Sequence, residues 1–186
     1  MLDHYDIYRR EAGRYERLIR REDPDRNIER VLDEWMPKGR NIRAADIGAG
    51  TGRLSAWLAQ RAESLVLTDA SSAMLEEAAA KLRAMGVSNW ETRTADHRAL
   101  PLADGSVDLV TAGWTICYLA DHGAPDWEAN LAAAMAEIRR ALRPGGTAIV
   151  FETMGTGFFD EPTPPANLLP YYAELERRYE IGRAHV

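Results

Sequence analysis

From residue 42 to residue 151, strand-like segments alternate with segments whose apolar residues recur at helical spacing. The strand-like runs lie at 42–47, 64–68, 90–94, 107–112 and 147–151, and the helix-like segments lie at 53–61, 72–85 and 127–142. Parallel strands need a crossover connection, and a helix is the usual one. We therefore predict an α/β fold, a doubly wound parallel sheet with helices on both faces. Ligands of such sheets bind at the carboxyl ends of the strands.

Segments of other character flank this region. Apolar residues at helical spacing predict two N-terminal helices, separated by Asp23-Pro24-Asp25, and we interpret residues 1–40 as a helical lid. Residues 41–152 form the predicted ligand-binding domain. Beyond them a loop rich in glycine and proline leads to one more helical pattern, so residues 153–180 are expected to be a loop and a C-terminal helix.

Bulk composition narrows the class of protein. A chain of 186 residues with 46% hydrophobic residues can build one α/β domain with a substantial core. Its net charge of −6 disfavours a nucleic-acid partner. Cys117 is the only cysteine, which predicts neither a disulfide framework nor a metal site and fits a reducing cytoplasm. No apolar run is long enough to span a bilayer, so we expect no membrane partner.

The stretch AADIGAGTGRLS places glycine at every second position directly after the first predicted strand. Gly48, Gly50 and Gly52 can adopt positive φ angles and carry no Cβ, so the backbone can turn sharply and approach a ligand closely. This loop lies where the fold class places ligands. The glycines therefore predict a ligand-binding turn.

Two classes of ligand use such a turn, and charge separates them. A dinucleotide site has the spacing G-x-G-x-x-G and holds a pyrophosphate, whereas the spacing here is G-x-G-x-G and Asp46 precedes it. A carboxylate there repels a pyrophosphate and attracts an ammonium or sulfonium group. A nicotinamide-dependent oxidoreductase is therefore disfavoured, and we expect a ligand that is cationic near the loop.

Carboxylates also follow the next two strands. The two oxygens of Asp69 can accept hydrogen bonds from both hydroxyls of a ribose. Asp96 can accept from an adenine amino group, and the backbone N–H of His97 can donate to a ring nitrogen. Met74, on the helix after Asp69, can cover the adenine face.

The motifs DIGAGTGRLS, LTDASSAML, TADHRALPLADGSVDLV and EIRRALRPGG resemble, in this order, those of class I S-adenosylmethionine-dependent methyltransferases of the small-molecule type. The resemblance covers roughly residues 43–151 and implies a Rossmann-like sheet of order 3-2-1-4-5-7-6 with strand 7 antiparallel. It implies S-adenosylmethionine as cofactor, with the methionine part on the glycine loop, the ribose at Asp69 and the methionine amino group beside Gly113. The implied cofactor-binding residues are Asp46, Gly48, Ala49, Gly50, Asp69, Ala70, Met74, Asp96, His97 and Gly113.

Structural interpretations stand beside these roles. An aspartate after a strand is also a common turn or N-cap residue, and Asp96 in particular could cap a turn. Met74 fits the core as well as the cofactor. Gly145 and Gly146, after Pro144, are interpreted as a turn before the fifth strand without a role in ligand binding.

Methyl transfer from a sulfonium needs an aligned nucleophile and a site shielded from water, so a catalytic base is optional and we assign no catalytic residue. Tyr8 and Tyr15 of the lid and Trp114 and Tyr118 after the fourth strand are predicted to contact a small-molecule acceptor, although the latter two fit a core equally. His122 is the best-placed titratable group, and a surface histidine is its simpler interpretation.

The end of the chain departs from the family pattern, because no strands 6 and 7 follow residue 151. The closing IGRAHV resembles a translated sequencing adapter, so we expect a longer natural protein, a sheet of order 3-2-1-4-5, and no biological role for residues 181–186. The predicted function is methyl transfer from S-adenosylmethionine to a small molecule. The alternative is a catalytically silent domain that binds S-adenosylmethionine or a partner. The acceptor, the methylated atom and the oligomeric state are left open.

Overall fold

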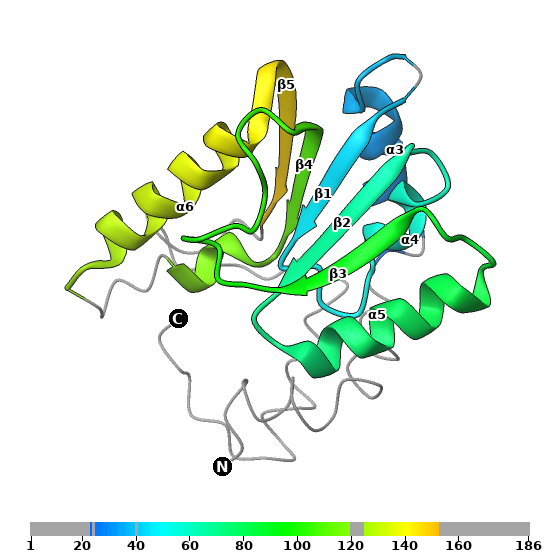
Figure 1. Ribbon diagram of the computed structural model, residues 1–186, viewed down its shortest axis with the longest axis horizontal. Helices are drawn as coiled ribbons and strands as arrows, with labels where there is room; N and C mark the ends of the chain where they lie inside the picture. Colours follow the sequence, from blue (N-terminus) through cyan, green and yellow to red (C-terminus); the bar gives the residue numbers. More distant parts are fainter. Residues whose placement is uncertain (1–22, 24, 40, 120–124, 153–186) are drawn as a thin grey trace, which may run out of the picture. The chain divides into compact units, whose positions relative to one another are not determined.

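The computed structural model describes residues 23, 25–39, 41–119 and 125–152 (Figure 1). Tyr8, Tyr15, His122 and everything predicted beyond residue 152 lie outside these residues. The described part contains, in chain order, α3 (Asn27–Trp35), β1 (Arg43–Ile47), α4 (Ser55–Leu58), β2 (Ser64–Asp69), α5 (Ser72–Ala84), β3 (Trp90–Thr94), β4 (Val107–Gly113), the 3₁₀ helix η1 (Ile116–Leu119), α6 (Trp127–Ala141) and β5 (Leu142–Phe151).

The five strands form one sheet in the order β3-β2-β1-β4-β5, and every neighbouring pair is parallel. The predicted α/β fold and strand order are therefore confirmed. The order reverses at β1, which pairs with β2 on one side and with β4 on the other; Ala45, for example, lies opposite Val66 and Val110. The loops that leave β1, β2 and β4 consequently meet at the carboxyl edge of the sheet.

Successive residues of β1 face opposite sides of the sheet, as the period of a strand requires. Ala44 packs with Leu32, Trp57 and Leu82 on the face covered by α3, α4 and α5, whereas Ala45 packs with Ile138 of α6 on the other. Figure 1 shows this division, with α6 on one side of the sheet and the other three helices opposite. The central strand is thus buried on both faces, and the site at its end has rigid support.

The helix after β1 is shorter than its pattern predicts. Residues 53–61 were expected to be helical, but α4 covers only Ser55–Leu58. The preceding residues instead continue the glycine loop as turns, in which Gly52 N donates to Ala49 O at 2.9 Å. These tight turns keep the loop against the ends of β1 and β4, and the apolar spacing alone could not distinguish them from helix.

The last strand begins earlier than predicted, at Leu142 instead of residue 147. Leu142 pairs with Val107, and Thr147 pairs with Leu109, so residues 143–146 form an irregular bulge within the strand. Gly145 has a φ angle of 77° there. The predicted glycine turn thus lies inside the bounds of β5, because the chain turns and then pairs with β4 again in a shifted register.

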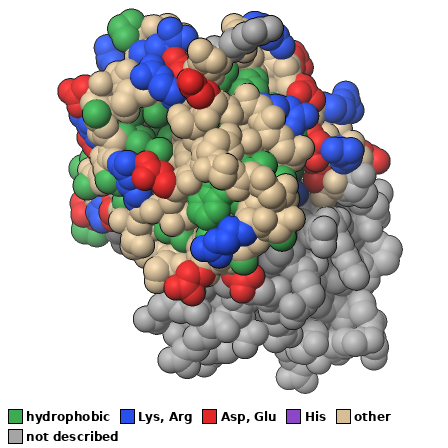
Figure 2. All heavy atoms as spheres, turned by 45° about the vertical axis from the view of Figure 1, so that its right-hand side comes forward, with side chains coloured by type: hydrophobic (Ala, Val, Ile, Leu, Met, Phe, Trp, Pro, Cys, Tyr) green, Lys and Arg blue, Asp and Glu red, His purple; other side chains and the backbone are tan. Residues whose placement is uncertain are grey.

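Charges of both signs are interspersed on the face of the molecule shown in Figure 2. A single-sign field on that face would have favoured a polyanionic or polycationic partner. Within the described residues, no helix has the length and apolarity needed to cross a bilayer.

Candidate functional site

The glycine loop follows β1 and has a left-handed backbone conformation at each of its three glycines. Gly48, Gly50 and Gly52 have φ angles of 61°, 53° and 78°, a region that residues with a Cβ rarely adopt. A Cβ on Gly48 would lie 2.0 Å from Thr115 Oγ1, and one on Gly52 would lie 3.0 Å from Ala78 Cβ. The loop is therefore pressed against both the loop after β4 and helix α5, and glycine is required at Gly48 for space as well as for conformation.

Asp46, in β1 just before this loop, is a buried carboxylate with only 1% of its surface exposed. Thr111 Oγ1 donates to its Oδ1 at 2.8 Å, and Ser55 Oγ donates to its Oδ2 at 2.5 Å. Burial, with a smaller contribution from the charge of Asp69, raises the pKa of Asp46 to about 6 against the lowering effect of the two hydroxyl bonds. Both oxygens are engaged by hydroxyls and the side chain is buried, so a carboxylate in this position can influence its surroundings through its electric field.

Asp69 ends β2, the neighbour of β1, and its carboxylate joins two loops. Gly50 N donates to Oδ2 at 2.9 Å, and Ser71 N donates to Oδ1 at 2.8 Å. A carboxylate oxygen accepts more than one hydrogen bond, so each oxygen retains capacity for a hydroxyl donor. The arrangement fixes the orientation of the side chain and leaves it able to accept from two hydroxyls of a ligand.

Asp96 follows β3 at the next position along the carboxyl edge. Arg98 donates to it from its backbone N and its Nε, both 2.8 Å from Oδ1, and from Nη2, 2.7 Å from Oδ2. The arginine side chain thereby lowers the pKa of Asp96 to about 2. Arg98 also donates to Asn130 Oδ1 on α6 at 2.7 Å. The turn interpretation and the ligand interpretation both fit this geometry, since Oδ2 retains a free lone pair.

His97 points its side chain toward the glycine loop. Its Nε2 lies 2.7 Å from Thr115 Oγ1, the atom that closely approaches Gly48. Burial lowers the pKa of His97, so the ring is neutral at pH 7. Its Nδ1 is buried and has no hydrogen-bond partner among the described residues. The motif predicted a role only for the backbone N–H of His97, and the contact of its ring with Thr115 had no local signal because 18 positions separate the two residues.

Gly113 and Trp114 leave β4 beside the glycine loop. A Cβ on Gly113 would lie 3.0 Å from Leu54 Cδ1. Trp114 has a φ angle of 52°, which is unusual for a bulky residue and typical of functional sites. Its ring stacks on Phe151 with centroids 5.9 Å apart, and the Arg53 guanidinium lies 4.6 Å from its centroid. These contacts hold the strained conformation and join the loops after β1, β4 and β5.

The remaining predicted residues lie around this edge. Met74 is 4% exposed, and its Cε would be 3.5 Å from a Cβ on Gly50, so it belongs both to the core and to the floor beneath the loop. Ala49 is buried and its N–H donates to Thr68 O at 2.9 Å, whereas Ala70 is exposed. Tyr118 is 47% exposed, so the core interpretation does not apply to it.

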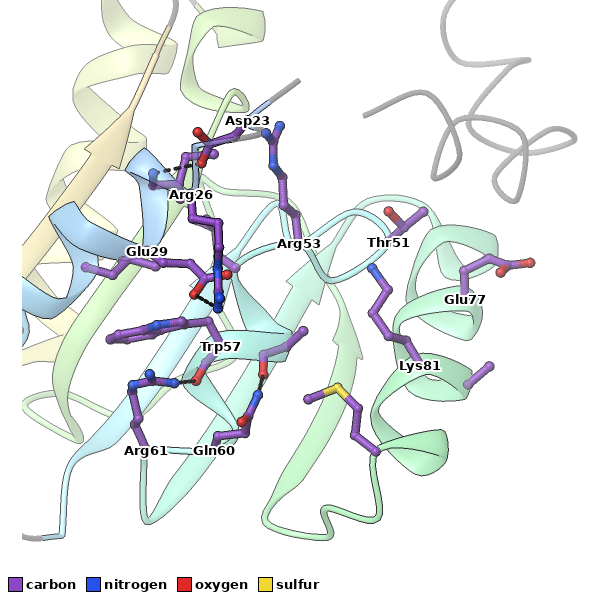
Figure 3. A pocket seen from close by; sticks show the side chains of 16 residues that line it. Asp23, Arg26, Glu29, Thr51, Arg53, Trp57, Gln60, Arg61, Glu77 and Lys81 are labelled. Atoms are coloured by element: carbon purple, nitrogen blue, oxygen red, sulfur yellow. Dashed lines mark hydrogen bonds and ion pairs between the residues drawn. The ribbon is translucent and has the colours of Figure 1, made fainter. Parts of the chain in front are cut away.

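A cavity of about 660 Å³ lies elsewhere, between α3, α4 and α5 (Figure 3). None of the residues predicted to bind the cofactor lines it. Its charged groups include internal pairs, such as Arg26 with Glu29 at 2.5 Å, and the Arg61 guanidinium lies 4.0 Å from the Trp57 ring centroid. We therefore assign the candidate site to the strand ends. Within the described ranges, no cluster of three or more His, Cys, Asp or Glu side chains could hold a metal ion.

Comparison with known proteins identifies the family of this chain. The family described as a methyltransferase domain matches residues 45–150. A malonyl-[acyl-carrier protein] O-methyltransferase of Pectobacterium atrosepticum is 33% identical over 156 residues, which are 82% of this chain and 53% of that protein. The chain spans about half the length of the curated relatives it matches.

Solved structures of similar fold include an S-adenosylmethionine-dependent methyltransferase from Aquifex aeolicus. It has a TM-score of 0.63 and 20% identity, and the match covers 82% of this chain and 78% of that one. A phosphoethanolamine N-methyltransferase from Haemonchus contortus, in complex with phosphoethanolamine and S-adenosylhomocysteine, has a TM-score of 0.60 and 24% identity. That match covers 84% of this chain and 34% of the other.

Proposed function

Since the chain belongs to the class I S-adenosylmethionine-dependent methyltransferases, we propose that it transfers a methyl group from S-adenosylmethionine to a small-molecule acceptor. The proposed cofactor site lies at the carboxyl ends of β1, β2 and β4. It consists of the cofactor-binding residues predicted from the motifs, with Trp114 and Tyr118 on the acceptor side.

The observation that carries this proposal is the Asp69 carboxylate. Its two oxygens are held by the N–H groups of Gly50 and Ser71, at the point where the strand order reverses. A ribose hydroxyl pair matches two fixed acceptors of this kind. Gly50 has a positive φ angle, and a Cβ there would meet only Met74 Cε at 3.5 Å. The loop therefore has room beside this carboxylate, which fits the methionine part of the cofactor.

The negative charge of the site also supports S-adenosylmethionine as the ligand. The buried Asp46 carboxylate lies beneath the loop and raises the local negative potential together with Asp69. A sulfonium and an ammonium group are attracted by this field, and a pyrophosphate is repelled. S-adenosylmethionine, when bound, supplies a methyl group activated by the sulfonium charge.

The protein's part in the reaction is binding, alignment and exclusion of water. The Trp114 ring lies at the end of β4 and is held between Arg53 and Phe151, a cluster that we call the Trp114 wall. We propose that this wall orients the acceptor. A small-molecule acceptor is supported by relatives named as a malonyl-[acyl-carrier protein] O-methyltransferase and as a ubiquinone/menaquinone biosynthesis C-methyltransferase.

Calorimetric titration tests the cofactor. We expect S-adenosylmethionine and S-adenosylhomocysteine to bind and NADH to give no heat above dilution. Tight binding of NADH, or no binding of either adenosyl ligand, would refute the proposed site.

Turnover separates the enzyme from a silent binding domain, the alternative interpretation. The assay measures S-adenosylhomocysteine released with each of a panel of carboxylate, hydroxyl and amine acceptors. Release that depends on an acceptor supports the transferase. Cofactor binding without release from any acceptor in the panel would favour the silent domain.

A further inference from the structure

Glu152, the residue directly after β5, has a carboxylate that none of the predicted motifs contains. Its Oε1 accepts hydrogen bonds from three consecutive backbone N–H groups, those of Thr115 at 3.1 Å, Ile116 at 2.7 Å and Cys117 at 3.0 Å. These N–H groups open η1, and consecutive N–H groups of this kind form a concave site for an anion. The chain itself thus supplies the anion that orders the loop after β4.

The loop after β4, which Glu152 holds, contacts the glycine loop. Thr115 Oγ1 would lie 2.0 Å from a Cβ on Gly48, and it is 2.7 Å from His97 Nε2. The side chain of Thr115 therefore connects the loop after β1 with the loop after β3. A shift of Thr115 would remove the support of Gly48 and the partner of His97 together.

A second connection runs through the neighbouring residues. Trp114 N donates to Phe151 O at 2.7 Å, and the two rings stack. The loop after β4 thus donates one hydrogen bond to the backbone of Phe151, the last residue of β5, and three to the side chain of Glu152. The other carboxylate oxygen, Oε2, is buried without a hydrogen-bond partner among the described residues.

We propose that Glu152 is a positioning residue for the cofactor site: through its three N–H acceptor bonds it fixes Thr115, and through Thr115 it fixes the glycine loop and His97. The inference rests on the proposed function, since the site it positions is the proposed S-adenosylmethionine site. It assigns a role in ligand binding to a residue outside the family's glycine and aspartate motifs.

Three variants of the full chain test this inference. Glu152→Gln keeps a side-chain oxygen that can accept the three bonds, and Glu152→Ala removes it. Asp108→Ala is the matched control, because Asp108 is also a buried carboxylate that accepts a backbone N–H, that of Arg43 at 2.8 Å, but lies at the opposite, amino end of the sheet. Each variant is measured by hydrogen exchange of the Thr115–Cys117 amides and by calorimetric titration with S-adenosylhomocysteine.

In Glu152→Ala we expect these amides to exchange at least about tenfold faster and S-adenosylhomocysteine to bind about tenfold more weakly, the usual effect of losing a hydrogen bond to a charged group. Glu152→Gln should recover most of both properties. Asp108→Ala should lower the melting temperature without changing the affinity.

Unchanged affinity in Glu152→Ala, or unchanged exchange of the three amides, would overturn the proposal. Equal losses in Glu152→Gln and Glu152→Ala would also overturn it, because the charge and not the loop geometry would then matter. Failure of the proposed function is distinguishable, since the unaltered protein would then fail to bind S-adenosylhomocysteine at all.

Discussion

Replacing Asp46 by asparagine should weaken binding of S-adenosylmethionine and at the same time stabilise the fold at neutral pH. The two effects have opposite signs because the buried charge of Asp46 is expected to attract the cationic ligand but destabilises the folded state. Asparagine has nearly the same shape, and its amide can replace the carboxylate in the hydrogen bonds with Ser55 and Thr111, since a hydroxyl can donate or accept.

The stability effect follows from linkage. The pKa of Asp46 is about 6 in the folded protein against 3.8 for an ordinary aspartate. The folded state therefore binds the proton more tightly, and this group's contribution to stability is greatest below pH 3.8 and is lost as the pH rises to about 6. A difference of roughly two pKa units corresponds to about 3 kcal/mol, an upper bound because asparagine fits the hydroxyls less well.

Thermal unfolding of both proteins across the pH range provides the measurement. The melting temperature of Asp46→Asn should approach that of the unaltered protein near pH 4 and exceed it by several degrees above pH 6, since 1 kcal/mol shifts a chain of this size by about 2–4 °C. Comparing the two proteins at each pH cancels the titration of all other carboxylates.

The binding effect is measured with two ligands that differ at sulfur. S-adenosylmethionine carries the sulfonium charge and S-adenosylhomocysteine does not. Asp46→Asn should therefore lower the affinity for S-adenosylmethionine by about tenfold and the affinity for S-adenosylhomocysteine by less. A tenfold change corresponds to the energy of one partly screened charge pair. Lower stability at neutral pH, or equal loss for both ligands, would refute the assignment of Asp46 as a buried charge that attracts the sulfonium.

Further substitutions test the other contacts. Asp69→Ala should weaken binding of S-adenosylhomocysteine at least about tenfold by calorimetry, and an unchanged affinity would remove Asp69 from the ribose site. Gly48→Ala should abolish binding of S-adenosylhomocysteine, because the added Cβ would lie 2.0 Å from Thr115 Oγ1. Gly86→Ala is the control: its φ angle of 73° is also positive, but no atom lies within 4 Å of the added Cβ, so this variant should bind the ligand normally. Arg98→Ala should reduce the preference for S-adenosylhomocysteine over its inosine analogue, if Arg98 orients Asp96 toward the adenine amino group; a constant preference would contradict this.

Periodicity was sufficient to predict the centre of the sheet. The central strands β1 and β4 are buried on both faces, so their apolar runs are visible in the sequence. The edge strand β3 has no buried residue and showed only as a short segment between a helix and a loop, and the strand order was implied by the family resemblance. The glycine loop was also predictable, since the spacing of Gly48, Gly50 and Gly52 reflects a local conformational requirement. Features determined by neighbouring residues in the chain are the ones that a single sequence reveals.

The contacts that organise the site had no such local signal. Thr115 and Glu152 are 37 positions apart, and Arg98 and Asn130 are 32 apart. The backbone N–H groups at the start of the 3₁₀ helix η1 donate to the carboxylate of Glu152, a partner that the sequence of η1 does not reveal. Pairings of this kind exist only once the sheet has brought the loops together, and hydrophobic patterns do not encode them.

The position of Asp46 connects the stability of this fold with its proposed chemistry. Asp46 is buried near the carboxyl end of β1, and a charge there costs free energy that two hydroxyl bonds only partly offset. Ser55 opens α4 and Thr111 belongs to β4, so the elements that hold the carboxylate are those that flank the glycine loop. An apolar residue at this position would serve the core better. We propose that a cationic ligand at the glycine loop accounts for the charge, because its binding would supply a counter-charge to Asp46.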